Sequence, residues 1–336
     1  MSTKLSDYAY DLPRELIAQR PLERREDSRM MVLYRARHAI EHRQFRELKT
    51  FLGAGDLLVL NDTRVHTARR LSDDGAVEFL FLERVGQKRW KSLVKPGRKM
   101  RVGATAKIDN ITLRVEEITD GGERIVALEK DVDLYAGGSM PLPPYITRAS
   151  DEKDTARYQT VFGDAPGAIA APTAGLHFTE EILGEIPHTF VTLHVGPGTF
   201  LPVRSENITD HRMHEERFFI SPEAANNINN AQRVIAVGTT VVRVLETASF
   251  KTRLLKAVKF NKPQVEAQSG GTDLFIYPPF AFRVVDVLLT NFHLPCSTLL
   301  MLVSAFAGRE FLLRAYEEAI RERYRFYSYG DCMLIL

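Results

Sequence analysis

The pattern of apolar and polar positions changes twice along the chain. Before about residue 65 and after about residue 150, apolar runs of strand length alternate with segments of helical period. Residues 30–45 predict a β-hairpin, residues 45–55 a short helix ended by two glycines, and residues 56–61 a buried strand. Residues 11–18 (DLPRELIA) predict a further helix, with Asp11 as its cap.

Between these parts the runs are shorter and alternate with period two. Strands are predicted at about 76–85, 89–95, 105–108, 111–118 and 123–129, separated by turn sequences such as DDG, KPGRK and DGGE. Strands at this spacing are typical of a small antiparallel barrel. We therefore expect an α/β (mixed α+β), barrel-like main domain of residues 1–65 and 150–336, with residues 66–149 inserted as an antiparallel β-barrel domain.

The C-terminal half predicts alternating strands and helices. Strands are expected at 190–195, 233–237, 273–276 (DLFI), 285–291 and 331–336, and helices after Ser221, Gly238 and Ser297 and at 310–324. In the first strand, alternation places Phe190, Thr192 and His194 on one face.

Composition narrows the class of protein but not its function. The chain has 336 residues, 44% hydrophobic and 26% charged, as in ordinary globular proteins. Its 45 Lys and Arg nearly balance its 43 Asp and Glu, so a nucleic-acid surface would require local clustering. Two cysteines, Cys296 and Cys332, exclude a disulfide framework and fit a reducing cytoplasm. Neither a secretory leader nor a membrane span is expected. The sequence carries no signal for oligomerisation, and a monomer is the expectation.

Histidines and carboxylates gather in two neighbouring stretches. FVTLHVGPGTF carries His194, and HRMHEE carries His211, His214 and Glu216. Such a set could bind a metal, but it lacks the H-E-x-x-H spacing of helical zinc sites. Acid–base chemistry or a polar binding edge is favoured, and we assign no metal.

The stretch VIAVGTTVVR predicts a strand, a glycine turn and the start of a helix. Its free helix N–H groups suit an anion, with hydroxyls from Thr239 and Thr240, while Gly238 forms the turn and Arg243 lies one turn into the helix. An ordinary helix start is the competing interpretation.

Two more polar loops precede helices. APTAGLHFTEE carries Thr173, Gly175 and His177, with Thr179 as a helix cap. TNFHLPCSTLLM places Asn291 and His293 at the end of a strand, where ligands of α/β sheets bind. A buried histidine bonded to the backbone is the competing interpretation for His293.

Two basic stretches are candidates for RNA contact. Residues 88–101 contain seven Lys and Arg, no acid and one Trp, a combination that suits phosphates and base stacking. An exposed barrel face is the alternative. The second stretch, RERYRFYSYG, interleaves arginines with aromatics that more often belong to a core. The candidate nucleic-acid residues are Lys88, Arg89, Trp90, Lys95, Arg98 and Lys99.

Several long motifs follow one another in a particular order, from NDTRV and APTAGLHFT through FVTLHVGPGTFLPV and DHRMHEE to VIAVGTTVVRVLE, VDVLLTNFHLPCSTLLMLVSAFAG and YRFYSYGDCMLI. Together they resemble the S-adenosylmethionine:tRNA ribosyltransferase-isomerases of queuosine biosynthesis, over essentially the whole chain. The resemblance implies transfer and isomerisation of the ribosyl moiety of S-adenosylmethionine onto 7-aminomethyl-7-deazaguanine at the tRNA wobble position. Epoxyqueuosine-tRNA, adenine and methionine are the implied products. S-adenosylmethionine serves as co-substrate, and no prosthetic group or metal is implied.

This chemistry requires a base near the ribose C5′ hydrogens and an acid near the departing adenine, roles that suit histidine. The candidate catalytic residues are His177, His194, His214, Glu216 and His293. The candidate residues for S-adenosylmethionine are Thr173, Gly175, Gly238, Thr239, Thr240, Arg243, Glu246 and Asn291, with Glu216 or Glu246 facing the methionine ammonium. A metal-dependent hydrolase using His194, His211 and His214, and a non-catalytic tRNA-binding protein, are the alternatives.

Overall fold

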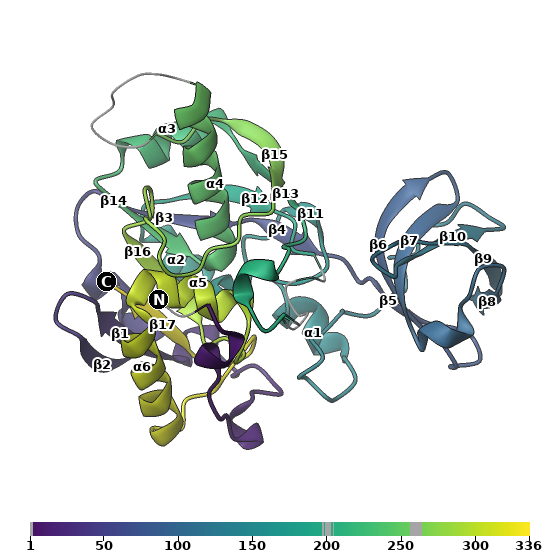
Figure 1. Cartoon of the computed structure of the whole chain (residues 1–336), viewed down its shortest axis with the longest axis horizontal. Coiled ribbons are helices and arrows are strands. Elements are labelled where there is room, and N and C mark those ends of the chain that lie inside the picture. The colour runs from purple at the N-terminus through teal and green to yellow at the C-terminus, as the bar shows by residue number, and fades with distance from the viewer. Residues whose placement is uncertain (1–2, 197, 199–202, 204, 256–263) are drawn as a thin grey trace.

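A nine-stranded mixed sheet forms the centre of the main body (Figure 1). The computed structural model describes residues 3–196, 198, 203, 205–255 and 264–336. The strands follow the order β15 (Gln268–Thr272), β13 (Glu216–Ile220), β12 (His188–Leu193), β3 (Asp56–Asn61), β14 (Arg233–Val237), β16 (Val287–Asn291), β17 (Cys332–Ile335), β1 (Arg29–Tyr34) and β2 (Ala39–Gln44). The four strands β12, β3, β14 and β16 are mutually parallel, so their carboxyl ends meet at one edge.

Both faces of this sheet are covered, which explains why β3 is buried along its whole length. Leu57 and Val59 point into one core, and Leu58 and Leu60 into the other, as alternation requires. The first core lies under four helices: α3 (Pro222–Asn230), α4 (Thr239–Leu255), α5 (Thr298–Ala307) and α6 (Arg309–Arg321). The second is covered by the 3₁₀ helix η4 (Phe45–Phe51) and by α2 (Glu180–Gly184).

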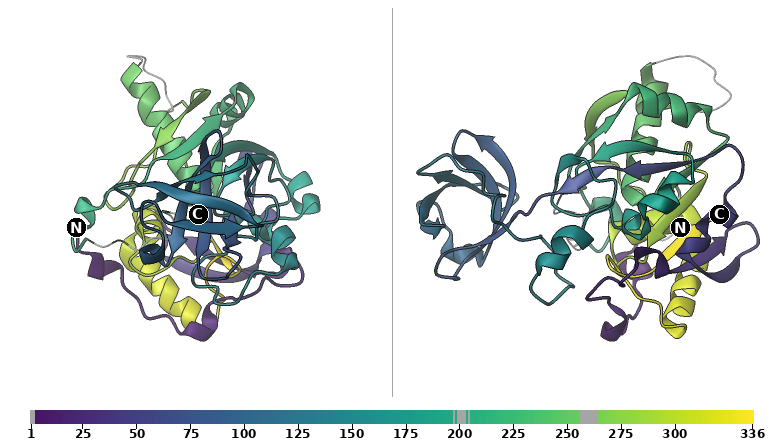
Figure 2. Two further views of the ribbon diagram at one scale, coloured as in Figure 1. Left: turned by 90° about the vertical axis from the view of Figure 1, so that its right-hand side faces the viewer. Right: turned by 180° about the vertical axis from the view of Figure 1, so that it is seen from behind.

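Six antiparallel strands form a separate barrel-like sheet that stands to one side of the main body (Figures 1 and 2). Their order is β5 (Arg69–Leu71), β6 (Glu78–Gly86), β7 (Arg89–Lys95), β10 (Arg124–Leu128), β9 (Ile111–Ile118) and β8 (Thr105–Ile108). The sheet curls toward closure, because the Asp73 N–H just after β5 donates to the Lys107 carbonyl of β8 at 2.8 Å. It has its own apolar core, built around Phe79, Phe81 and Trp90. The expected mixed α/β body with an antiparallel barrel is confirmed.

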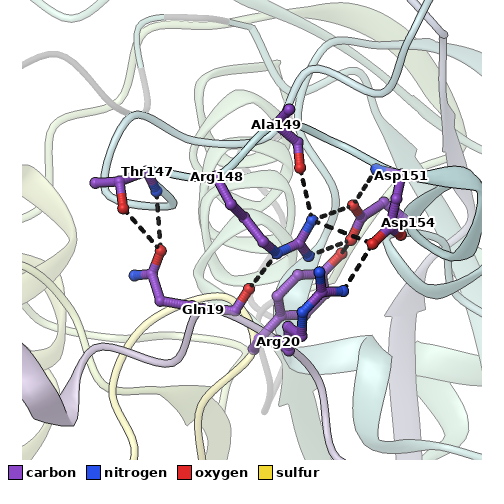
Figure 3. Close-up of polar contacts among 8 residues, drawn as sticks. Gln19, Arg20, Thr147, Arg148, Ala149, Asp151 and Asp154 are labelled. Atoms are coloured by element: carbon purple, nitrogen blue, oxygen red, sulfur yellow. Dashed lines mark hydrogen bonds and ion pairs between the residues drawn. The ribbon is translucent and has the colours of Figure 1, made fainter.

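The chain enters the barrel after β4 (Thr63–Val65), which pairs in parallel with β11 (Ala165–Ala168). On its return it is tied to the N-terminal segment just before α1 (Glu152–Arg157). The Arg148 guanidinium donates to both oxygens of Asp154, at 2.6 and 2.7 Å, and to the Gln19 carbonyl at 2.9 Å (Figure 3). Arg20 and Asp151 form a second ion pair at 2.7 Å. These contacts hold residues 148–154 against residues 19–20.

Most predicted elements are present, including the hairpin of β1 and β2, the caps Thr179, Ser221 and Ser297, and the turn at Gly238. Two predictions are wrong. Residues 11–18 form only a three-residue 3₁₀ turn, Arg14–Leu16, because the Ala18 N–H and the Leu16 carbonyl bond to Phe326 of a distant segment.

The second wrong prediction concerns residues 273–276, which are not a strand. The strand lies just before them, as β15, because the Leu274 N–H bonds the Thr272 hydroxyl and the Leu274 carbonyl accepts from Arg243. Among the described residues, no helix has both the length and the apolar composition needed to cross a bilayer.

Candidate active site

The carboxyl ends of the four parallel strands carry a continuous set of polar groups. Asn61, the last residue of β3, connects this strand to β12 and to α4: its Oδ1 accepts the Leu193 N–H at 3.0 Å, and its Nδ2 donates to the Leu193 carbonyl at 3.0 Å and to the Thr240 hydroxyl at 3.4 Å. Polar side chains at this edge are typical of ligand sites in α/β sheets.

A pocket of about 590 Å³, counting the part open to solvent, lies at this edge. It is lined by six of the predicted residues: Thr173, Gly238, Thr239, Thr240, Asn291 and His293. Aromatic rings from Tyr145, Phe292 and Tyr327 form part of its wall, and those of Tyr145 and Tyr327 lie 4.7 Å apart. The pocket therefore combines a polar edge with flat apolar surface.

One wall of this pocket is the N-terminus of α4. Gly238 has a φ of +94°, a conformation that favours glycine, and it turns the chain directly from β14 into the helix. The first N–H groups of a helix have no partner within it, and the helix dipole makes this end electropositive. The wall can bind a carboxylate or another anion.

His293 lies in the same pocket and is held rigidly. Its Nε2 is 2.9 Å from the Thr290 hydroxyl, and its backbone N–H donates to the Tyr316 hydroxyl at 2.9 Å. Burial lowers the pKa of His293 to about 3, so the ring is neutral at pH 7. The buried histidine expected from sequence is also a pocket residue.

His177 lies on the 3₁₀ helix η6 (Thr173–His177) and lines a second pocket of about 310 Å³. Its Nδ1 is 2.7 Å from the Ser28 hydroxyl, and its Nε2 is 3.3 Å from Asn291 Oδ1. Burial lowers the pKa of His177 to about 4, with a smaller contribution in the same direction from the nearby positive charges of Arg25 and Arg325. Asn291 thus connects the two pockets.

Gly175, two residues before His177, has a packing role. A Cβ there would lie 2.8 Å from both Phe162 and Thr160, and the residue does not line the main pocket. Its predicted contact with the co-substrate is not supported by this position.

His194 follows the last residue of β12 and faces the segment after β3. Its Nδ1 is 2.9 Å from the Thr63 hydroxyl, and Thr192 donates to Asp62 at 2.6 Å, so these two residues share a face as predicted. Burial first, then the charge of Arg217, lowers the pKa of His194. Burial raises the pKa of Asp62.

The two histidine stretches meet, as their spacing suggested. The Gly196 N–H donates to Glu216 Oε1 at 2.9 Å, and the His214 ring lies so close to Gly198 that a Cβ there would approach it to 2.8 Å. His214 itself is exposed. Of the residues between them, 197, 199–202 and 204 lie outside the described part of the chain.

Glu216 and Arg243 bind each other in the interior of the main body. They form a buried ion pair, and Arg243 also donates to the carbonyls of Thr272 and Leu274. Both were predicted to act on substrate, Glu216 as a catalytic group and Arg243 as a ligand contact. In the structure the pair joins α4 to β13 and to the start of the glycine-rich loop, so we expect a bracing role for both residues.

The prediction that Glu246 faces the methionine ammonium is wrong. Its carboxylate is fully buried and accepts the backbone N–H groups of Arg283, Val284 and Val285 at 3.0–3.2 Å. Glu246 does not line the main pocket. It fixes the loop before β16 to α4.

The predicted RNA-contact residues of the barrel are two basic groups and the buried Trp90. Lys88 and Arg89 lie at the start of β7, where Arg89 pairs with Glu116 at 2.8 Å. Lys95, Arg98 and Lys99 lie at its other end, are exposed, and form no ion pair with any described residue. Trp90 is only 2% exposed, between Phe81 and Tyr135, so its predicted stacking on a base is wrong.

Sequence reasoning missed the polar residues that contact the histidines or lie at the ends of the strands beside them. Ser28, Asn61, Asp62, Thr63 and Thr290 receive no role from spacing, although NDT directly after a buried strand was a usable signal. The aromatics of RERYRFYSYG belong to the core, as the alternative interpretation held. His211 packs edge-on to Phe275 at 5.4 Å, and the described residues contain no cluster of three or more metal-ligating side chains.

The fold and site described above are those of an α/β protein with a polar pocket at the carboxyl edge of its sheet and a separate antiparallel barrel. A family model described as queuosine biosynthesis protein matches residues 5–335. The chain belongs to this family.

Its relatives match it end to end. The S-adenosylmethionine:tRNA ribosyltransferase-isomerase of Carboxydothermus hydrogenoformans is 50% identical over 99% of this chain and 100% of its own length. That of Halothermothrix orenii is 47% identical over the same shares. A crystal structure of S-adenosylmethionine tRNA ribosyltransferase from Thermotoga maritima is 39% identical with a TM-score of 0.56, and the match covers 98% of this chain and all of that one.

Proposed function

We propose that this chain transfers and isomerises the ribosyl moiety of S-adenosylmethionine onto 7-aminomethyl-7-deazaguanine at the wobble position of tRNA. The products are epoxyqueuosine-tRNA, adenine and methionine. The observation that carries the proposal is the polar, aromatic-lined pocket at the carboxyl edge of the sheet, in a chain whose relatives of this name match its whole length. A metal-dependent hydrolase is disfavoured, because His194, His211 and His214 form no ligand cluster with other described residues.

S-adenosylmethionine occupies the 590 Å³ pocket in this proposal. Its methionine carboxylate binds the N-terminus of α4, where Gly238 allows a close approach and Thr239 and Thr240 add hydroxyls. Its adenine lies against the wall that contains Tyr145 and Tyr327. With Glu246 and Glu216 both engaged elsewhere, carbonyl and hydroxyl oxygens of the pocket accept from the ammonium.

In this proposal, the histidines at the carboxyl edge of the sheet carry out the proton transfers of the reaction. His293 lines the pocket and is neutral, so it can hydrogen-bond a neutral group, while its lowered pKa makes it a weak base and leaves it without an imidazolium proton to donate at pH 7. His177 is neutral for the same reason and reaches the pocket through Asn291. His194 and His214 come from the segments that meet at Gly196 and Gly198 and complete the set.

The tRNA contacts the barrel in this proposal. Lys95, Arg98 and Lys99 supply charge without competing ion pairs among the described residues, which favours phosphate binding. Residues 66–149 act as an inserted domain that presents this charge beside the main body of residues 1–65 and 150–336. The enzyme works as a cytoplasmic monomer without a prosthetic group.

A product assay tests the proposal. With S-adenosylmethionine and tRNA bearing the aminomethyl base, the protein should release adenine and methionine together, one of each per tRNA modified. The control is tRNA that carries guanine at the wobble position, which lacks the 7-aminomethyl group whose amine attacks and should release neither. Transfer of a methyl group to the tRNA, without a pentose-derived ring, would contradict the proposal.

A further inference from the structure

The second pocket, of about 310 Å³, is lined by three arginines from separate segments of the chain. Arg25 belongs to the 3₁₀ helix η3 (Arg25–Asp27), Arg157 ends α1, and Arg325 precedes β17. His177 and Ser328 complete the part of the lining that faces the main pocket, and Ser328 lines both.

These arginines bind backbone rather than carboxylates in the part of the chain that the structure describes. None forms an ion pair with a described residue; they donate instead to backbone carbonyls. Arg25 bonds the carbonyls of Leu176 and Ala156, both at 3.1 Å. Arg157 bonds those of Leu22 and Glu23, at 2.8 and 2.9 Å.

Two of their donors remain unused although they are buried. Arg157 Nε and Arg325 Nη1 are inaccessible to solvent and have no hydrogen-bond partner in the structure. Unsatisfied buried donors are rare in folded proteins, and they are costlier on a charged group. Burial, followed by the repulsion of Arg157, lowers the pKa of Arg25, so the charged forms raise one another's energy. A bound anion would relieve both costs.

The nearest carboxylates are not available to do so. Asp154 accepts two hydrogen bonds from Arg148 (Figure 3). It accepts a further one from the Tyr329 hydroxyl at 2.8 Å. Asp331 accepts the backbone N–H groups of Arg29 and Arg325, at 2.9 and 2.8 Å. Burial lowers the pKa of Arg325 and outweighs the charge of Asp331, which raises it, so the three guanidinium groups share the pocket without a directly paired carboxylate among the described residues.

We propose that Arg25, Arg157 and Arg325 bind a backbone phosphate of the tRNA, next to the nucleotide that enters the main pocket. Guanidinium groups match phosphate oxygens in geometry and charge. The other anion available is the methionine carboxylate of S-adenosylmethionine, but the N-terminus of α4 in the adjacent pocket already provides for it. The proposal rests on the proposed function and adds a phosphate contact in the main body, separate from the basic end of β7.

Binding measurements test it with Arg157→Gln and Arg325→Gln. Each should weaken binding of the modified tRNA roughly tenfold or more and reduce the slope of log affinity against log salt by about one. Affinity for S-adenosylmethionine alone, measured by calorimetry, should be unchanged. Arg24→Gln is the matched control: it removes the same charge one residue from Arg25, but Arg24 is exposed and outside this pocket.

Different results overturn the proposal in different ways. Loss of S-adenosylmethionine affinity with normal tRNA binding would assign the pocket to the carboxylate. Normal binding of both ligands by folded variants would show that the arginines only brace the backbone. If a glutamine variant does not fold, competition by inorganic phosphate against tRNA on the wild type is the alternative test. Phosphate should displace tRNA more strongly than chloride of equal ionic strength, and equal displacement would refute phosphate binding in this pocket. None of these results depends on adenine release, which tests the proposed function separately.

Discussion

Glu216→Ala is expected to destabilise the main body while leaving the barrel intact. The substitution leaves the Arg243 guanidinium without its carboxylate, although both side chains are only 5–6% exposed. Removing one member of a buried ion pair typically costs about 3–5 kcal/mol, because the remaining charge is uncompensated. The Gly196 N–H loses its acceptor as well. With a urea m-value of about 3 kcal/mol/M, the midpoint should fall by roughly 1 M or more.

The chain provides separate spectroscopic probes for its two parts. Its single tryptophan, Trp90, is buried in the barrel, so tryptophan fluorescence reports unfolding of that sheet. The long helices α4, α5 and α6 all lie in the main body, so far-ultraviolet circular dichroism at 222 nm reports mainly on that part. Urea unfolding of Glu216→Ala should shift the circular dichroism transition and leave the fluorescence transition nearly in place.

The neighbouring Glu215 supplies the control. It is exposed and forms no ion pair with a described residue, so Glu215→Ala should change the circular dichroism midpoint little. In an Arg243→Met background, Glu216→Ala should cost less than in the wild type, because no buried charge is left behind. An unchanged midpoint for Glu216→Ala, together with lost turnover, would refute the bracing role and return Glu216 to the catalytic groups.

Three further predictions concern the barrel, the histidines and pH. Reversing the charges of Lys95, Arg98 and Lys99 together should weaken tRNA binding and flatten its salt dependence without changing S-adenosylmethionine binding. As a control, reversing the charges of Lys107, Arg114 and Lys130 elsewhere on the barrel should weaken tRNA binding less. Equal effects of the two triple variants would mean that tRNA does not bind at the end of β7. His194→Ala and His214→Ala should each reduce single-turnover rates about 10²–10⁴-fold with the fold retained, and full activity in either folded variant would remove that histidine from the catalytic set. Burial lowers the pKa of His177 to about 4 in the folded state, against about 6.5 in the unfolded chain. Its contribution to stability is therefore complete above pH 6.5 and is lost as the pH falls toward 4, by about 3 kcal/mol. His177→Asn should flatten the dependence of unfolding free energy on pH in that window, and an unchanged dependence would contradict the burial argument.

The local sequence determined the elements and the polar ends of the strands. Period-two alternation predicted five of the six barrel strands and missed the three-residue β5. The caps Ser221 and Ser297 and the turn at Gly238 followed from residue types that each local geometry requires. Asn291 and His293 could be chosen because polar residues at the end of an apolar strand stand out in the chain, and His177 because it lies in a polar loop before a helix. The prediction failed at residues 11–18, where backbone pairing with Phe326, more than 300 residues away, overrides the helical pattern.

The roles of charged residues depended on the tertiary structure. Sequence treats Glu216, Glu246, Arg243 and Trp90 as available for ligands, whereas folding buries them against partners 27 to 45 residues away. The three arginines of the second pocket are separated by as many as 300 positions and share no motif, so only the packing of η3, α1 and the segment before β17 brings their charges together. Local propensity acts over a few residues, but burial and electrostatics depend on neighbours that only the folded chain brings within a few ångströms.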